Sequence, residues 1–360
     1  MTTTIDNEQK TLNVPNLRFP EFEGEWEKCK LGDVCNTSTG NKNTQDKTDD
    51  GIYPFYVRSQ TVERINSWTF DGEAILTAGD GVGVGKVFHH TYGKIGVHQR
   101  VYILSDFKCD ANYLFHLFSS KFYNRVKRMS AKNSVDSVRK EMITDMPLSL
   151  PCCQEQVKIG NMLSILDERI ATQNKIIDKL QSLIKGIAQN IVRYNKPNVR
   201  LSDSLSCSSS TLQESDVSEH GTYPVYGANG VVGYLDNYNT ENEAIYIIKD
   251  GSGVGSTSYV TGKCSATGTL NILRAKEGYS LQYLYYMLKV FNFEPYKTGM
   301  AIPHIYFKDY GKAKVFCPTY KEQLQYARLL SAIDKRLTVE HGLLISLSLQ
   351  KQYLLRQMFI

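Results

Sequence analysis

The stretch Pro151–Val192, PCCQEQVKIGNMLSILDERIATQNKIIDKLQSLIKGIAQNIV, carries apolar side chains at alternating steps of four and three residues. Gln173 is the polar interruption of a stripe made of Ile159, Leu163, Leu166, Ile170, Ile177, Leu180, Ile184, Ile187 and Ile191. This spacing keeps one face of a helix turned toward a partner helix and is typical of a coiled coil. The stretch is therefore predicted to form one long helix with a buried seam.

A second version of this stretch closes the chain at Pro318–Ile360. The same register runs through Tyr326, Leu330, Ile333, Leu337, Leu344, Leu347, Leu354 and Met358, and Glu340 stands where Gln173 stands in the first copy. Two such stripes in one chain satisfy each other, and the connection between them requires the second helix to return antiparallel to the first. We therefore expect Gln173 and Glu340 to meet within the seam and to fix its register.

The rest of the chain is also duplicated, at a constant spacing of 170 residues. Tyr53-Pro54-Phe55-Tyr56 returns as Tyr223-Pro224-Val225-Tyr226, and Asp80-Gly81-x-Gly83-Val84-Gly85 returns as Asp250-Gly251-x-Gly253-Val254-Gly255. In the long helices the spacing between the two copies is 167 residues, because Pro151 corresponds to Pro318 and Glu155 to Glu322. A constant spacing over this length indicates an internal repeat.

The predicted order is globule, helix, globule, helix. The domain boundaries that we expect are a flexible tail at 1–16, a first globule at 17–150, a spacer helix at 151–193, a second globule at 194–317 and a C-terminal spacer helix at 318–360. Short β-branched or aromatic segments predict strands at Gly51–Arg58, Ala74–Ala78, Lys86–His89 and Val97–Leu104, with a helix at Asn112–Arg128 mirrored at Leu281–Phe291. Ser202–His220 is expected to be a surface loop. The fold class is α+β, with two α/β domains joined by two long antiparallel coiled-coil helices and related by a pseudo-two-fold axis.

Composition supports a folded, intracellular protein. The 360 residues are 41% apolar, and neither a signal sequence nor an apolar run of membrane-spanning length is visible. The eight cysteines include no CxxC pair, so we expect reduced thiols and no metal site. Cytoplasmic localisation is the expectation.

Positive charge is concentrated in one segment, although the net charge is only +5. The segment is bounded by Lys121 and Glu141, and its basic residues are Lys121, Arg125, Lys127, Arg128, Lys132, Arg139 and Lys140. A segment of this kind fits the neutralisation of nucleic-acid phosphates. The alternative is a helix face whose charges are simply solvated.

No motif for catalysis was found. The repeated glycine segment matches neither GxGxxG nor GxxxxGK[ST]. It is better explained as a tight turn between strands that needs positive φ. A contact between its backbone amides and a DNA phosphate is the minor alternative. A methyltransferase acting on a base amine needs an Asn or Asp before Pro-Pro, and the sequence contains no Pro-Pro. A nuclease site built on Asp80, Asp106 and Lys108 is disfavoured, because the second copy replaces the last two with Lys276 and Gly278. The expected catalytic set is none.

Two similar modules held at a fixed separation suit a ligand with two sites at a fixed separation, and duplex DNA is the commonest such ligand. The chain also resembles a known family, the specificity (S) subunits of Type I restriction-modification systems. The resemblance covers almost the whole chain from Leu17. It rests on Leu150-Pro151-x-x-x-Glu155-Gln156-x-Lys158-Ile159 running into Leu166-Asp167-Glu168-Arg169-Ile170, on the repeat of this pattern from Cys317-Pro318, and on the opening Arg18-Phe19-Pro20-x-Phe22-x-Gly24-x-Trp26.

The resemblance implies two target recognition domains that read an asymmetric, bipartite DNA target. It also implies partners: two modification (methyltransferase) subunits that carry S-adenosylmethionine, and restriction subunits that use ATP and Mg²⁺. This chain itself is expected to bind no cofactor and to have no enzymatic activity. Candidate subunit-interface residues are Glu155, Gln156, Asp167, Arg169, Glu322, Gln323, Asp334 and Arg336. For Asp167, Arg169 and their counterparts, ordinary surface charge is an equally good explanation.

Base readout uses side chains such as Arg for guanine and Asn or Gln for adenine. Candidates in the first globule are Arg58, Gln60, Arg64, Asn66, Gln99, Arg100, Lys132, Asn133 and Arg139. Candidates in the second are Asn229, Asn237, Lys263, Lys297, His304 and Lys308. Taken singly, each fits a phosphate contact or plain surface better than a base contact, because half or more of the hydrogen bonds at such interfaces go to the backbone. The alternative function is a coiled-coil scaffold whose duplicated β-rich domains bind proteins.

Overall fold

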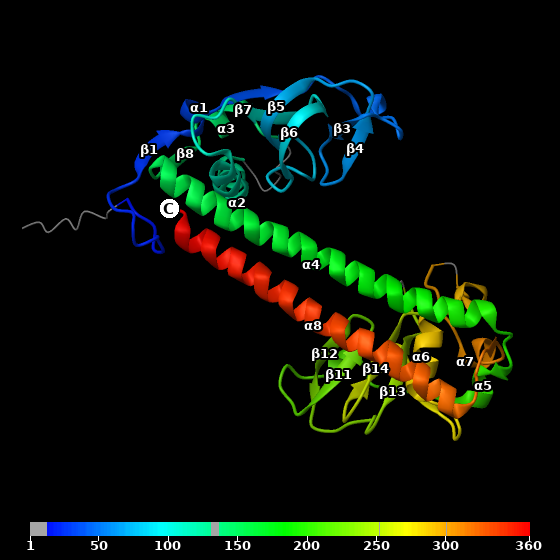
Figure 1. The fold of residues 1–360 in the computed structure, drawn as a ribbon. Helices are drawn as coiled ribbons and strands as arrows, with labels where there is room; N and C mark the ends of the chain where they lie inside the picture. The colour runs from blue at the N-terminus through cyan, green and yellow to red at the C-terminus, as the bar shows by residue number, and fades with distance from the viewer. Residues whose placement is uncertain (1–12, 131–136, 252, 300) are drawn as a thin grey trace, which may run out of the picture. The chain divides into compact units, whose positions relative to one another are not determined.

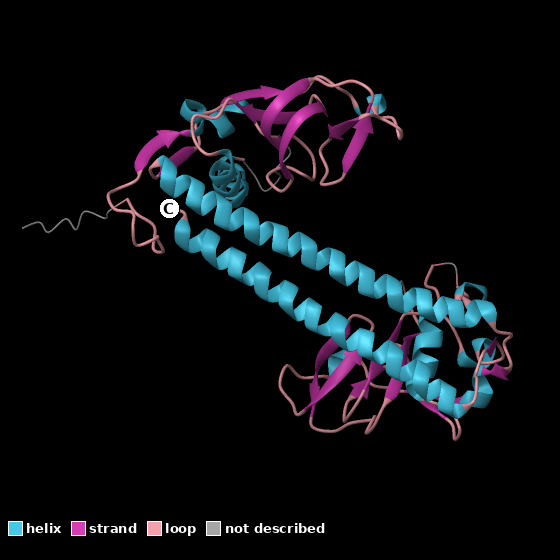
Figure 2. Cartoon of the chain, viewed as in Figure 1, coloured by secondary structure: helices cyan, strands magenta, loops and turns pink. Residues whose placement is uncertain are grey.

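The computed structural model describes residues 13–130, 137–251, 253–299 and 301–360, and the chain divides into two compact units (Figure 1). Unit 1 comprises Met1–Thr172 and Leu344–Ile360, and unit 2 comprises Gln173–Leu343. The two long helices are α4 (Cys153–Tyr194) and α8 (Tyr320–Met358), and each contributes one segment to each unit. Their bounds lie within two residues of the predicted spacer helices, and the mixed composition of helices and strands confirms the α+β class (Figure 2).

Unit 1 is built around a six-stranded sheet of order β2-β7-β5-β6-β3-β4, in which β3 and β6 are parallel and the other pairs antiparallel. A separate antiparallel pair, β1-β8, lies beside the start of α4 in the sequence. The elements are β1 (Glu27–Lys30), α1 (Leu31–Val34), β2 (Asn36–Thr39), η1 (Thr44–Asp46), β3 (Tyr53–Tyr56), β4 (Val62–Ile65), β5 (Phe70–Ala78), β6 (Phe88–Val97), β7 (Val101–Ser105), α2 (Ala111–Met129), α3 (Lys140–Thr144) and β8 (Pro147–Leu150).

Unit 2 repeats this topology with its sheet split into β10-β16-β13-β14 and β12-β11-β15. The split occurs because the counterpart of β6 is interrupted at residues 261–264, which leaves β14 and β15 as separate strands. The elements are β9 (Val199–Arg200), α5 (Leu201–Ser204), β10 (Leu205–Ser209), η2 (Glu214–Asp216), β11 (Tyr223–Gly227), β12 (Gly230–Leu235), β13 (Ala244–Ile248), β14 (Thr257–Val260), β15 (Ser265–Ala266), β16 (Leu270–Ala275), α6 (Leu281–Lys289), η3 (Glu294–Tyr296), α7 (Phe307–Tyr310) and β17 (Lys314–Val315).

Three element predictions were wrong. Val97 ends β6 rather than starting the next strand, because a turn at His98–Arg100 precedes β7. The strand expected at Lys86–His89 begins at Phe88 and continues through Gly93, whose φ of +95° allows the chain to pass without a break. The loop expected at Ser202–His220 contains β10, which pairs with β16.

The antiparallel seam is confirmed within each unit. In unit 2, the Gln173 side-chain amide donates to the backbone carbonyl of Glu340 at 3.0 Å and to its carboxylate, and both side chains are buried. In unit 1, Lys351 pairs with Asp167, while Ile159 and Met358 share one core. The residue numbers therefore increase along α4 in the direction in which they decrease along α8, so the paired segments are antiparallel. The predicted position of the two globules at opposite ends of the helical pair stays a prediction.

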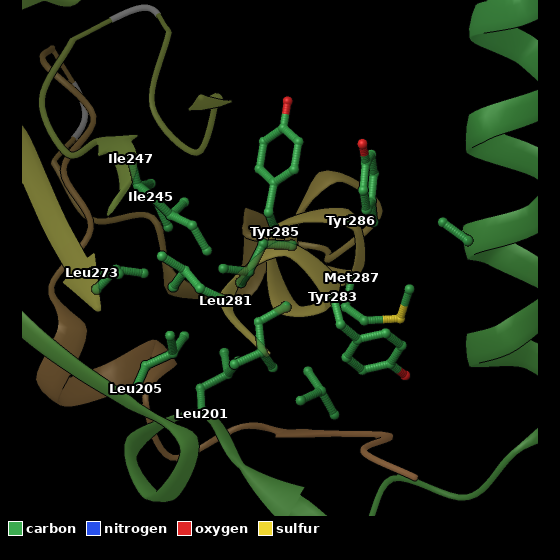
Figure 3. Packing of buried hydrophobic residues seen from close by; sticks show 14 of the residues in the cluster. Leu201, Leu205, Ile245, Ile247, Leu273, Leu281, Tyr283, Tyr285, Tyr286 and Met287 are labelled. Carbon is green, nitrogen blue, oxygen red and sulfur yellow. The ribbon is translucent and has the colours of Figure 1, made fainter. Parts of the chain in front are cut away.

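The core of unit 2 gathers around α6. Figure 3 shows Leu201, Leu205, Ile245, Ile247 and Leu273 beside the aromatic side chains of that helix. The core also takes in buried residues of both long helices: Ile184, Ala188, Ile191, Ala327 and Leu330. In unit 1 the equivalent helix, α2, packs with Leu163 and Met358 in the same way. Each globule is thus joined to the seam by one continuous hydrophobic core.

A buried glutamine in the first turn of each long helix ties that helix to its globule. Gln156 accepts a hydrogen bond from the backbone N–H of Asp110 at 2.9 Å and donates to the carbonyl of Pro151 at 2.8 Å. Gln323 does the same with Ser280, at 2.9 Å, and Pro318, at 2.9 Å. Asp110 and Ser280 are the N-cap residues of α2 and α6.

These contacts correct the assignment of three residues to a subunit interface. The side chains of Gln156 and Gln323 are buried in the contacts described above. Glu155 is also fully buried, and the Arg18 guanidinium donates a hydrogen bond of 2.8 Å to each of its carboxylate oxygens. Glu322 is exposed, but it accepts hydrogen bonds from the backbone and hydroxyl of Thr319. The sequence motif therefore specifies how the chain enters each helix.

None of the helices in the described ranges carries an apolar run of the length that a bilayer crossing needs.

We predict that Gln323→Leu destabilises the protein by about 1–3 kcal/mol, because it leaves the buried N–H of Ser280 and the carbonyl of Pro318 without their partner. Urea unfolding followed by circular dichroism measures the change. The matched control is Gln325→Leu, on the exposed face of the same helix. Equal unfolding midpoints for the two variants would contradict the structural role of Gln323.

Candidate nucleic-acid interface

The glycine segment of unit 1 is a tight turn between β5 and β6, as the sequence predicted. Gly81 and Gly85 have φ of +75° and +64°, values that a side chain strongly disfavours. Val84 is buried and anchors the turn in the core. The turn borders a cleft of about 450 Å³ whose other wall is the chain after β3.

Asp80, at the start of this turn, organises two predicted DNA-binding arginines. Nη1 of Arg58 lies 2.8 Å from one carboxylate oxygen of Asp80, and Nε of Arg100 lies 3.7 Å from the other. The Arg58 and Arg100 side chains remain 44% and 64% exposed, so both guanidinium groups keep donors free for a ligand. Two arginines against one carboxylate leave this cluster positive, and Asp80 limits the orientations that Arg58 can adopt.

His98 lies next to the same cluster. Burial is the main cause that lowers its pKa, and the positive charge of Arg58 adds to the effect. Its Nδ1 accepts a hydrogen bond from the backbone N–H of Arg100 at 3.0 Å, and its Nε2 lies 3.3 Å from the hydroxyl of Thr44. The ring therefore holds the turn that presents Arg100.

The remaining candidates of unit 1 are dispersed. Gln99 precedes Arg100 and donates to the side-chain carbonyl of Asn43 at 2.5 Å. Four of these candidates are exposed: Arg64 on β4, Gln60 and Asn66 in the segments that flank β4, and Arg139 just before α3. Lys132 and Asn133 lie outside the described residues. Arg58, Gln99 and Arg100 are thus the candidates that the fold associates with the turns at one end of the sheet.

The basic segment between Lys121 and Glu141 is only partly a free cationic surface, and this corrects the prediction that its basic residues are available to neutralise phosphates. Arg125 donates to the carbonyls of Met142 and Asp145 at 2.7 and 2.8 Å, and Lys121 donates to that of Phe359 at 3.4 Å. Burial lowers the pKa of both Lys121 and Arg125. These two residues fasten α2 to its neighbours, whereas Lys127 and Arg128 remain exposed.

Unit 2 has a cleft at the corresponding glycine turn, with a volume of about 550 Å³ and a different lining. Asp250, the counterpart of Asp80, lies with one carboxylate oxygen 2.7 Å from Nδ1 of His304. Lys308 stands over the ring of Tyr306 at 5.2 Å, and all four side chains line the cleft. The aspartate is shared with unit 1, but this cleft is lined by β10, β16 and residues 304–308, whereas the unit 1 cleft is lined by the segment after β3.

The other candidates of unit 2 lie elsewhere. Lys263 stands 4.7 Å from the ring centroid of Tyr238, Asn229 occupies the turn between β11 and β12, and Asn237 is exposed after β12. Lys297 is paired with Glu294 at 2.6 Å, three residues earlier in the chain. Of the six candidates, the fold brings His304 and Lys308 into one cleft.

The polar residues proposed for a subunit interface on the long helices are largely engaged within the chain. Asp167 pairs with Lys351, Asp334 accepts from the Tyr286 hydroxyl at 3.3 Å, and Arg336 pairs with Glu340. Arg169 is exposed.

An apolar surface that the sequence analysis missed lies on α8. Ile345, Leu349 and Tyr353 follow one another at a spacing of four residues within unit 1 and are 61%, 60% and 58% exposed. This spacing places them on one face of the helix, separate from the seam residues Leu347 and Leu354. In the sequence, its signal is a second hydrophobic stripe in the C-terminal helix, beside the seam.

Comparison with known proteins places these features in a family context. The family model described as "Type I restriction modification DNA specificity domain" matches residues 23–182 and 199–349. The EcoDI specificity subunit of a Type I restriction enzyme from Escherichia coli is 26% identical over 170 residues, which cover 47% of this chain and 37% of that protein. The MjaVIII specificity subunit from Methanocaldococcus jannaschii is 28% identical over 198 residues, which cover 51% of this chain and 45% of that protein.

The chain thus spans less than half the length of these two curated relatives. A crystal structure of the S subunit of a Type I restriction-modification system from M. genitalium has the same fold. It aligns with a TM-score of 0.75 at 18% identity, covering 96% of this chain and 99% of that one.

We predict that Arg58→Ala weakens binding to duplex DNA that carries the target sequence by about 1–3 kcal/mol, roughly five- to 150-fold. The reason is that the guanidinium held by Asp80 is lost from the cleft. Fluorescence anisotropy with a labelled duplex measures the change. Lys28→Ala, which removes one exposed charge from β1, is the control and should change the affinity little. Equal losses for the two variants would show that the cleft has no special part in binding.

Proposed function

The chain belongs to the family of Type I restriction-modification DNA specificity domains, and from this membership we propose that it is the DNA-recognition subunit of such a system. In this role it selects the sequence at which partner subunits methylate or cleave DNA. It performs neither reaction and binds no cofactor itself.

The observation that carries the proposal is the pair of glycine-turn clefts. The same turn begins with Asp80 in unit 1 and with Asp250 in unit 2, but the side chains around it differ: Arg58 and Arg100 in one, His304 and Lys308 in the other. One framework with two sets of donors suits two different half-sites. The target is therefore an asymmetric, bipartite DNA sequence.

The long helices supply the gap between the half-sites. Each helix runs from one unit into the other and has 42 or 39 residues. A helix of this size is roughly 60 Å long. We propose that the length of these helices sets the number of unread base pairs between the two half-sites.

The apolar face of α8 is the docking surface for the partners in this proposal. Ile345, Leu349 and Tyr353 present a stripe of the kind that a partner helix covers. Two modification subunits would carry the S-adenosylmethionine site, and restriction subunits would use ATP and Mg²⁺. The eight cysteines are all free thiols, which supports a cytoplasmic location.

The function is tested by reading methylated motifs in the host genome with and without this chain. Loss of one bipartite motif on deletion is the expected result. Purified complex should also bind a duplex carrying this motif with an affinity that falls about 10³-fold or more between roughly 50 and 200 mM salt. A scaffold that binds only proteins would leave the motif in place and would bind no duplex.

The docking surface gives a separate prediction. Leu349→Asp should abolish copurification with the modification subunit, because it places a charge in an apolar interface, while the thermal unfolding temperature stays unchanged. Gln350→Asp, on a neighbouring exposed position, is the matched control. Retained copurification of the Leu349 variant would remove this surface from the interface.

A further inference from the structure

The repeated glycine turn is constant except at its apex. Five of its six positions are identical in the two copies: the aspartate, the three glycines and the valine. The third position is Val82 in the first copy and Ser252 in the second. Ser252 lies outside the described residues. A fixed frame that presents one variable side chain is what a recognition element requires.

Most of the fixed positions of the turn are held by contacts in unit 1, and Gly81 is required by its φ of +75°. Asp80 pairs with two arginines, and Val84 is 3% exposed in the core. A Cβ on Gly83 would lie 2.5 Å from the carbonyl oxygen of Arg58, and one on Gly85 would lie 3.0 Å from Tyr123. The turn therefore has little room to move or to accept other residues at these positions.

Unit 2 holds its turn in an equivalent way. Asp250 contacts His304, Val254 is 7% exposed, and a Cβ on Gly255 would lie 3.0 Å from Phe293. Gly251 and Gly255 have φ of +94° and +90°, like their counterparts in unit 1. The described positions of the second turn are thus constrained like their counterparts in unit 1.

Val82 stands out against these constrained positions because it is 95% exposed. A single exposed valine on a surface is ordinary. This one, however, lines the cleft beside Arg58, so a duplex attracted by the arginines brings its groove to the apex. A β-branched side chain also has few rotamers, so it presents its methyl groups in a defined direction.

We propose that the apex residue of the glycine turn is a specificity-determining position, and that Val82 contacts the 5-methyl group of a thymine in the major groove. The inference rests on the proposed function and deepens it. The thymine methyl is the apolar group that base pairs display in the major groove, and the minor groove offers no equivalent. Serine at the apex of the second turn does not share this preference, which fits half-sites of different sequence.

The test is a double-mutant cycle between protein and DNA. Full-length chain in complex with its modification subunits is measured against the methylated motif identified in the genome, in duplexes where each thymine of the unit 1 half-site is replaced in turn by uracil. Uracil keeps the base pairing and lacks the methyl group. At one position the replacement should weaken binding by the wild-type complex about fourfold, the effect of burying one methyl group.

Val82→Ala should remove this sensitivity: its affinities for the thymine and uracil duplexes should be equal and close to that of wild type for uracil. Val62→Ala, which trims an exposed valine on β4 in the same unit, should keep the fourfold ratio. Specific binding without any thymine position that couples to Val82, or a half-site without thymine, would overturn the inference alone. A wild-type complex with no sequence-specific binding would overturn the proposed function as well.

Discussion

A buried amide has to find a partner, and this constraint sets the register of the two long helices. Gln173 lies in an otherwise apolar seam and donates to both the backbone and the carboxylate of Glu340. The Glu340 carboxylate is further paired with Arg336, and the hydrogen bond from Gln173 is the main cause that lowers its pKa. Sliding one helix by a heptad would set each polar group against an apolar side chain and leave its hydrogen bonds unmade. The apolar stripe drives pairing, and the polar pair selects one alignment.

Register matters because the helices also hold the globules. Gln156 and Gln323 join the first turn of each long helix to the N-cap of α2 or α6, and the seam residues continue into the two hydrophobic cores. The position of each cleft is thereby linked to the position along the seam. The two copies share the aspartate, the glycines and the valine of the turn, whereas the linings of their clefts differ.

The sequence predicted the repeat, the long helices, their antiparallel packing and the contact between Gln173 and Glu340, because all of these follow from spacing along the chain. It failed where contacts are long-range. The interaction of Asp80 with Arg58 and Arg100 joins three turns of one sheet, and nothing local signals it. Glu155 was assigned to a subunit interface and Arg125 to a phosphate-binding segment because a charged residue is usually exposed, yet each has a specific internal partner that the fold supplies.

The central proposal is that the length of the long helices sets the gap between the two DNA half-sites. The direct test inserts one heptad into each long helix at the boundary between the two units in the sequence, between Thr172 and Gln173 and between Leu343 and Leu344, so that the seam keeps its phase. The readout is the methylated motif in cells. Seven residues add roughly 10 Å of helix, which corresponds to about three base pairs. The account predicts unchanged half-sites separated by a longer gap, and an active variant whose gap is unchanged would contradict it.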